Sequence, residues 1–179
     1  MEKRVGNMII QAPGGTAAKS SNTYKVSLPS SWVKEMGITD NDRQVELCFD
    51  GTAITISKRL GLEDFIAVCQ KNGHRLLLLA YYDEETLCSK IAADYTAHSL
   101  CVEDYIPDII RTAFGNNHAP TWEDYQTFLE DRCLSRNRAG LREYLQTLEL
   151  DEYDPLEIIK KTSGRMAEDN QWIKIEVIA

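Results

Sequence analysis

The residue types that most often carry catalysis or bind metals are few and scattered along this chain. Its histidines, His74, His98 and His118, each stand next to a predicted turn, which favours a surface or helix-capping role. Five cysteines occur singly, and this odd count at irregular spacing argues against both a disulfide framework and a zinc site. Phosphate-binding glycine motifs of the form G-x-x-x-x-G-K-[ST] or G-x-G-x-x-G are absent. We therefore predict a protein that is not an enzyme, with no catalytic residues, no metal site and no cofactor.

Four arginines gather around a predicted break between two helices. They are Arg132, Arg136, Arg138 and Arg142. Such a cluster can bind an anion, but arginines that simply neutralise nearby carboxylates of their own chain are the simpler interpretation.

The charge of the chain is unevenly distributed. Residues 1–59 hold 8 Lys and Arg against 6 Asp and Glu, a net charge of +2, whereas residues 60–179 hold 12 against 22, a net charge of −10. A basic head on an acidic body suggests two domains with different partners. A rigid acidic surface can occupy a channel built for nucleic-acid phosphates, although acidic surfaces also keep proteins soluble. The acidic groups considered for partner binding are Asp83, Glu84, Glu85, Glu103, Asp104, Asp108, Glu149, Asp151, Glu152 and Asp154.

The pattern of residues 1–59 predicts short strands around one short helix. Residues 24–28 alternate as a strand ended by Pro29, a helix over 32–36 ends at Gly37, and strands over 44–49 and 53–57 flank a turn. About 40 ordered residues rarely bury a sufficient core without a metal, disulfides or a partner chain. Because we expect neither metal nor disulfide, we predict a homodimer.

Residues 60–179 are predicted to form a separate α+β domain with a small antiparallel sheet and several helices. The expected helices cover 62–71, 106–114, a segment opening at Thr121, 138–148 and a segment after Asp154-Pro155; the expected strands cover 75–83, 87–96, 99–104 and 171–178. The longest apolar run, over 76–82, is far shorter than the roughly 20 residues of a membrane helix. We therefore expect a cytoplasmic protein without a membrane partner.

Within the first 59 residues, a specific order of motifs resembles a known family. A strand ends in Leu28-Pro29, a helix ends in Met36-Gly37-Ile38, Asp42 precedes the strand Val45-Glu46-Leu47, and a hairpin over 50–59 follows. This pattern is similar to the SpoVT/AbrB/MazE family. The resemblance implies a swapped-hairpin β-barrel in which two chains interleave, double-stranded DNA as a ligand, and a role as transcriptional regulator or antitoxin.

The resemblance also implies where DNA would be contacted. Lys25 matches the basic residue that the family commonly has just before the first strand's apolar run. The adjoining loop offers further donors for phosphates, namely Lys19, Ser20, Asn22 and Thr23. The chain departs from the family at Tyr24, where Gly is common, and in a longer loop that contains Gly14-Gly15. The alternative is that Lys25 and Lys19 are ordinary solvent-exposed residues without a role in binding.

Residues 60–179 are similar, over 121–125, 153–156 and 164–172, to an uncharacterised region from mobile elements of gut Firmicutes. Together with the AbrB-like head, the layout of the whole chain resembles a type II-A anti-CRISPR group from such elements. This implies a protein that obstructs target-DNA engagement by a type II CRISPR nuclease–guide RNA complex, whose channel accepts phosphates. The alternative hypothesis is an AbrB-type regulator or antitoxin whose acidic domain binds a toxin or another effector.

Overall fold

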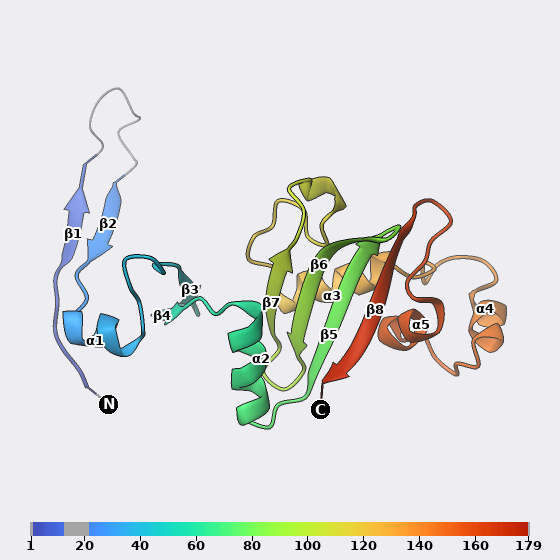
Figure 1. Cartoon of the computed structure of the whole chain (residues 1–179), viewed down its shortest axis with the longest axis horizontal. Coiled ribbons are helices and arrows are strands. Elements are labelled where there is room, and N and C mark those ends of the chain that lie inside the picture. Colours follow the sequence, from blue (N-terminus) through green and yellow to red (C-terminus); the bar gives the residue numbers. More distant parts are fainter. Residues whose placement is uncertain (1, 13–21, 179) are drawn as a thin grey trace. The chain divides into compact units, whose positions relative to one another are not determined.

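The computed structural model describes residues 2–12 and 22–178, and the chain divides into two compact units. These are Met1–Arg59, here called the N-terminal unit, and Leu60–Ala179, the C-terminal unit. The change in charge along the sequence therefore falls at the junction between the units. Figure 1 shows the elements of each unit.

The N-terminal unit consists of two hairpins and one short helix. Strands β1 (Met8–Gln11) and β2 (Thr23–Val26) pair antiparallel, α1 spans Ser30–Glu35, and β3 (Val45–Phe49) pairs antiparallel with β4 (Ile54–Lys58). The β3–β4 turn is fixed by Asp50, whose Oδ1 accepts hydrogen bonds from the backbone N–H groups of Thr52 and Ala53, both at 2.8 Å. Within the described part of this single chain, the four strands form two separate two-stranded sheets and no closed barrel.

The C-terminal unit confirms the predicted α+β class. Its sheet has the order β7-β6-β5-β8, with all neighbours antiparallel. The strands are β5 (Leu76–Asp83), β6 (Thr86–Asp94), β7 (Ser99–Asp104) and β8 (Gln171–Ile178), and the helices are α2 (Leu62–Lys71), α3 (Trp122–Asp131), α4 (Leu141–Thr147) and α5 (Pro155–Thr162). The C-terminal strand thus pairs with β5 and places β5 inside the sheet.

Helices cover both faces of this sheet, so its strands bury side chains in both directions. Leu77, Leu79 and Tyr81 of β5 pack into the large core with α3 and α5, whereas Leu76 and Leu78 pack under α2. Figure 1 shows α2 and α3 on opposite faces of the sheet. The nearly continuous apolar run of β5 follows from this burial, because alternating side chains of a strand point to opposite faces.

Local signals in the sequence explain where the helices of the C-terminal unit begin and end. Thr121 and Asp124 form a reciprocal capping box at the start of α3, and Asp154 caps α5, which has Pro155 in its first turn. The helix expected over 106–114 is absent and only a 3-10 turn, Ile109–Arg111, forms there. Asp108 and Thr112 are both extended, and the Asp108 side chain accepts a hydrogen bond from the Ile110 N–H, so the helical conformation is limited to Ile109–Arg111.

Candidate functional site

The β1–β2 hairpin has one face on which its polar side chains lie and one face that is apolar. The register pairs Ile9 with Lys25 and Gln11 with Thr23, so these four residues share one side of the hairpin. Lys25 and Thr23 are exposed there, and Asn22 is exposed directly before the strand. The structure thus brings three of the five predicted DNA contacts to one end of one hairpin, while Lys19 and Ser20 lie outside the described residues.

The opposite face of the same hairpin is entirely apolar. Met8 pairs with Val26 and Ile10 with Tyr24. All four side chains are between 52% and 61% exposed, although they would form a good core layer if they were covered. A two-stranded hairpin with such an exposed face is at best marginally stable alone.

The β3–β4 hairpin repeats this arrangement. Leu47 pairs with Ile56 and Phe49 with Ile54, so their side chains lie on one face together with Val45. Leu47, Phe49 and Ile54 are between 63% and 70% exposed. No residue of the described part of the N-terminal unit is buried. Monomeric proteins rarely expose contiguous apolar surfaces of this kind, so both hairpin faces are candidates for an interaction surface.

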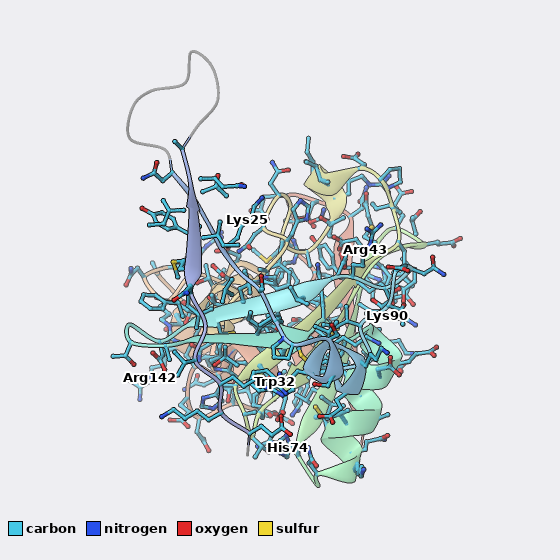
Figure 2. All side chains as sticks on the ribbon, turned by 90° about the vertical axis from the view of Figure 1, so that its left-hand side faces the viewer. Lys25, Trp32, Arg43, His74, Lys90 and Arg142 are labelled. Carbon is cyan, nitrogen blue, oxygen red and sulfur yellow. The ribbon has the colours of Figure 1, made fainter. Side chains whose placement is uncertain are left out.

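Basic side chains of the N-terminal unit differ in how they are engaged. Lys58 forms an ion pair with Asp42 at 2.8 Å, and the Arg4 guanidinium lies over the Trp32 ring at 5.6 Å. Lys25, in contrast, makes no hydrogen bond or ion pair with any residue the structure describes. Figure 2 labels Lys25, Trp32 and Arg43 in this unit. Lys25 is therefore available to an external anion.

Several of the acidic residues considered for partner binding serve the fold itself. Asp83 pairs with Arg111 at 2.5 Å, and Asp104 accepts a hydrogen bond from the Ser89 hydroxyl at 2.6 Å. Asp154 accepts from two backbone N–H groups at the start of α5, and Asp108 caps the 3-10 turn. These four carboxylates act as caps or internal ion-pair and hydrogen-bond partners.

The remaining acidic residues of these patches face solvent to different degrees. Glu103 accepts from the Tyr105 hydroxyl at 2.8 Å, Glu84 accepts from Asn170 at 3.3 Å, and Glu149 lies 3.8 Å from Lys161. Glu85, Asp151 and Glu152 are exposed and make no hydrogen bond or ion pair within the described structure. These last three are the acidic groups best placed to meet a cationic partner.

Arg132 is a structural residue rather than an anion site. It is only 7% exposed, and its guanidinium donates to the carbonyls of Gly164 and Gln171, to the Gln171 amide oxygen and to both carboxylate oxygens of Asp169. The two Asp169 contacts measure 2.6 and 3.0 Å. The Arg132 hydrogen bonds hold the pKa of Asp169 below its usual value. Of the two interpretations of the arginine cluster, neutralisation of a carboxylate holds for Arg132.

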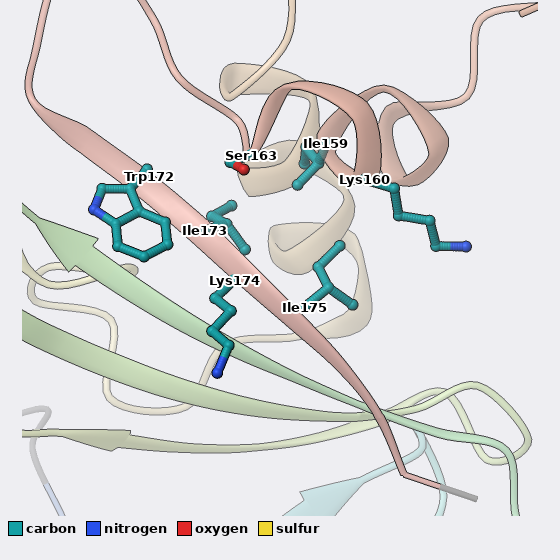
Figure 3. A pocket seen from close by; sticks show the side chains of 7 residues that line it. All are labelled: Ile159, Lys160, Ser163, Trp172, Ile173, Lys174 and Ile175. Carbon is teal, nitrogen blue, oxygen red and sulfur yellow. The ribbon is translucent and has the colours of Figure 1, made fainter.

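A shallow groove of about 320 Å³ lies between α5 and β8. Ile159, Lys160 and Ser163 line one side and residues 172–175 line the other (Figure 3). Both lysines are engaged, Lys160 with Glu157 and Lys174 with Glu176, each at 2.6 Å. The seven residues that line the groove include neither a carboxylate nor a histidine.

One cluster of potential metal ligands occurs among the described residues, at the end of α2. It combines Cys69, His74 and Asp94. Asp94 is buried, and its Oδ2 accepts from His74 Nδ1 at 2.6 Å and from Cys69 Sγ at 3.5 Å. Burial and then the Asp94 charge raise the pKa of the Cys69 thiol to about 11. This cluster was not among the predicted sites, because the cysteines were considered only as pairs. The signal in the sequence is the spacing Cys69-x4-His74 around Gly73, which ends the helix.

Comparison of this chain with protein-family models, with curated proteins and with solved structures finds no match. None of the helices in the described ranges has the length and apolar character needed to cross a membrane.

Proposed function

We propose that this chain is a non-enzymatic, DNA-binding homodimer that inhibits a type II RNA-guided nuclease at the step of target-DNA engagement. The observation that carries the proposal is the division of the β1–β2 hairpin into an apolar face and a face that presents Lys25 and Thr23. The apolar face needs a second copy, and the polar face suits phosphates.

The dimer is supported by the lack of a core in the N-terminal unit. Its apolar residues alternate correctly for burial, yet all those of β1 and β2, and Leu47, Phe49 and Ile54 in the second hairpin, stay exposed in the single chain. A second copy presents the same apolar faces, so the two copies can cover each other symmetrically. An interleaved barrel, as the SpoVT/AbrB/MazE resemblance implies, would convert two marginal hairpin pairs into one core.

DNA binding is supported by the placement of Lys25 on the face opposite to this core. In a dimer the two copies of Lys25 would be related by the two-fold axis, as the phosphates of a duplex are. A net charge of +2 in each N-terminal unit implies few phosphate contacts and an affinity that falls strongly with salt.

Replacing Lys25 by alanine is expected to weaken binding to double-stranded DNA without preference for sequence. Each lost phosphate contact lowers the slope of log K against log salt by about 0.9, so the dimer should lose about 2 units of slope. Fluorescence anisotropy with a labelled duplex at several salt concentrations measures this. Lys71→Ala, which removes an exposed cation at the end of α2, is the matched control and should leave the slope unchanged. If the slope of log K against log salt is the same in K25A and the parent, Lys25 does not contact DNA phosphates.

The nuclease target is supported by the acidic C-terminal unit. Its net charge is −10, and Glu85, Asp151 and Glu152 are exposed and not engaged by the described structure. A channel that binds a guide–target heteroduplex is positively charged, so a folded acidic domain can compete for it. The similarity of the whole layout to a type II-A anti-CRISPR group points to the same class of target.

The test is DNA cleavage by purified type II nuclease–guide RNA complexes. We expect cleavage to be lost when the protein is added before target DNA and retained when it is added afterwards. The double charge reversal Asp151→Lys with Glu152→Lys should weaken inhibition at least about tenfold, because like charges then meet the channel. The control is Asp131→Lys with Glu143→Lys, one substitution in α3 and one in α4, which changes the net charge by the same amount as the first pair. This control variant should inhibit cleavage as the parent does.

Unchanged cleavage at large excess, over several nuclease orthologues, would overturn the inhibitor proposal. The regulator or antitoxin hypothesis would then lead, and it requires binding to particular DNA sequences rather than to any duplex. Selection of operator sequences from random DNA would decide between these outcomes.

A further inference from the structure

The geometry points to a binding site for a divalent transition-metal ion of the zinc class, formed by Cys69 Sγ, His74 Nδ1 and an Asp94 carboxylate oxygen. These three atoms lie within 4.8 Å of one another and come from two segments that are distant in sequence. The inference does not depend on the DNA-binding proposal, since the site lies wholly in the C-terminal unit.

The end of α2 brings Cys69 and His74 together. The Gly73 N–H donates to the Gln70 carbonyl at 3.0 Å and the His74 N–H to the Cys69 carbonyl at 3.0 Å, which is the Schellman pattern. Gly73 has φ +68°, as the residue after the helix cap requires. This motif sets the side chain two residues after the cap beside the last turn of the helix, which places the imidazole next to the thiol. Figure 2 labels His74.

Asp94 is held in position by its own backbone. It ends β6, and its Oδ1 accepts from the N–H groups of Thr96 and Ala97 at 2.8 and 3.1 Å. The carboxylate is therefore fixed through one oxygen, while the other oxygen faces His74 and Cys69. Protein metal sites commonly orient a ligand in this way, through additional hydrogen bonds to the ligand side chain.

The distances require only a small rearrangement. Zinc–ligand bonds of about 2.0–2.3 Å in tetrahedral geometry separate two ligand atoms by about 3.3–3.7 Å. The Cys69 Sγ–Asp94 Oδ2 separation of 3.5 Å falls in that range. The His74 Nδ1–Asp94 Oδ2 separation of 2.6 Å is a hydrogen-bond distance and must open by about 0.7 Å to reach it. Binding through His74 requires its Nδ1 to carry no proton, and the thiol proton is released to water, so that thiolate, imidazole and carboxylate face the ion.

Charge and ligand type favour this class of ion. A thiolate and a carboxylate together neutralise a doubly charged cation in a place where Cys69 and Asp94 are 4% and 1% exposed. A thiolate and an imidazole suit zinc and cobalt and are poor ligands for magnesium or calcium. His74 is 27% exposed, so solvent can reach its side of the site, and water would complete a four-coordinate ion.

The test is titration of the full, metal-free chain with Co²⁺ and then with Zn²⁺. We expect one Co²⁺ per chain, with a near-ultraviolet charge-transfer absorption from the Cys69 thiolate that Zn²⁺ abolishes by displacement. Cys69→Ser should remove this absorption. His74→Gln should weaken Zn²⁺ binding at least about 100-fold, because loss of a ligand exceeds the 10–100-fold effect of losing an outer-shell partner.

His98→Asn is the matched control. His98 lies in the turn between β6 and β7 with φ +52°, a conformation that asparagine tolerates. The H98N variant should bind both metals as the parent does. Circular dichroism of each variant checks that the fold is kept. A parent chain without the charge-transfer absorption, or equal Zn²⁺ affinity in H74Q and H98N, would overturn the metal site and leave a His–Asp contact that only ties α2 to the β6–β7 turn.

Discussion

Replacing Arg132 by methionine is expected to lower the free energy of unfolding of the C-terminal unit by about 3 kcal/mol, because each buried polar group left without its hydrogen-bond partner costs about 1–3 kcal/mol. The guanidinium makes five hydrogen bonds, which equals the number of its N–H groups. Methionine keeps much of the volume, but the carbonyls of Gly164 and Gln171 lose the guanidinium donor and the Asp169 carboxylate keeps only its hydrogen bond from the Gln171 N–H. The substitution therefore tests unsatisfied polar groups more than packing.

Urea unfolding followed by hydrogen exchange of peptides from β5 and β6 measures this loss in the intact chain. Arg136→Met is the control, because Arg136 is 54% exposed, pairs with Glu130 at 2.8 Å and lies 4.3 Å from the Tyr153 ring. Exposed ion pairs contribute at most about 1 kcal/mol. Equal destabilisation by R132M and R136M would show that the Arg132 network contributes no more than a surface contact.

The elements of the C-terminal unit were predictable because their signals are local. The capping box at Thr121, the Asp154-Pro155 helix start and the apolar run of β5 each depend on neighbouring residues alone. The 106–114 segment is an exception: its apolar spacing suits a helix, but Asp108 and Thr112 are extended and leave only one 3-10 turn between them.

Side-chain clusters joined across the chain were not predictable in the same way. Arg132 meets Asp169 from 37 residues away, and His74 meets Asp94 from 20 residues away. Both contacts depend on tertiary placement, the second on the pairing of β5 with β6 and on the turn after α2. From sequence spacing alone, several carboxylates could pair with Arg132 or His74, and nothing in the sequence selects one of them.

The residues proposed to contact DNA fall between these cases. Thr23 and Lys25 stand two residues apart in one strand, so strand alternation alone places them on the same face. The register with β1 then shows that Gln11 and Ile9 share this face. The sequence does not tell which acidic side chains are free to contact a partner. In the structure, Asp83, Asp104 and Asp154 form contacts within the C-terminal unit instead.

Replacing Leu47 by glutamate is expected to convert the proposed dimer into monomers. Burial of a leucine side chain contributes about 2–3 kcal/mol, and a two-fold dimer loses it twice. The loss of about 4–6 kcal/mol corresponds to a dissociation constant raised about 10³–10⁴-fold, before the cost of burying two carboxylates is added. The turn of this hairpin is held by the hydrogen bonds that Asp50 accepts from Thr52 and Ala53, which the substitution does not touch.

Sedimentation equilibrium over a wide range of concentrations measures the change, against a chain mass of 20.3 kDa. Ile110→Glu is the matched control, since Ile110 is 86% exposed in the 3-10 turn of the C-terminal unit and receives the same charge. We expect I110E to sediment as a dimer like the parent and L47E as a monomer whose N-terminal unit loses protection from hydrogen exchange, because folding and association are coupled there. A parent chain that is monomeric at every concentration, with its N-terminal hairpins protected, would show that this unit is stable with its apolar faces exposed, and both the dimer and the two-fold presentation of Lys25 would have to be abandoned.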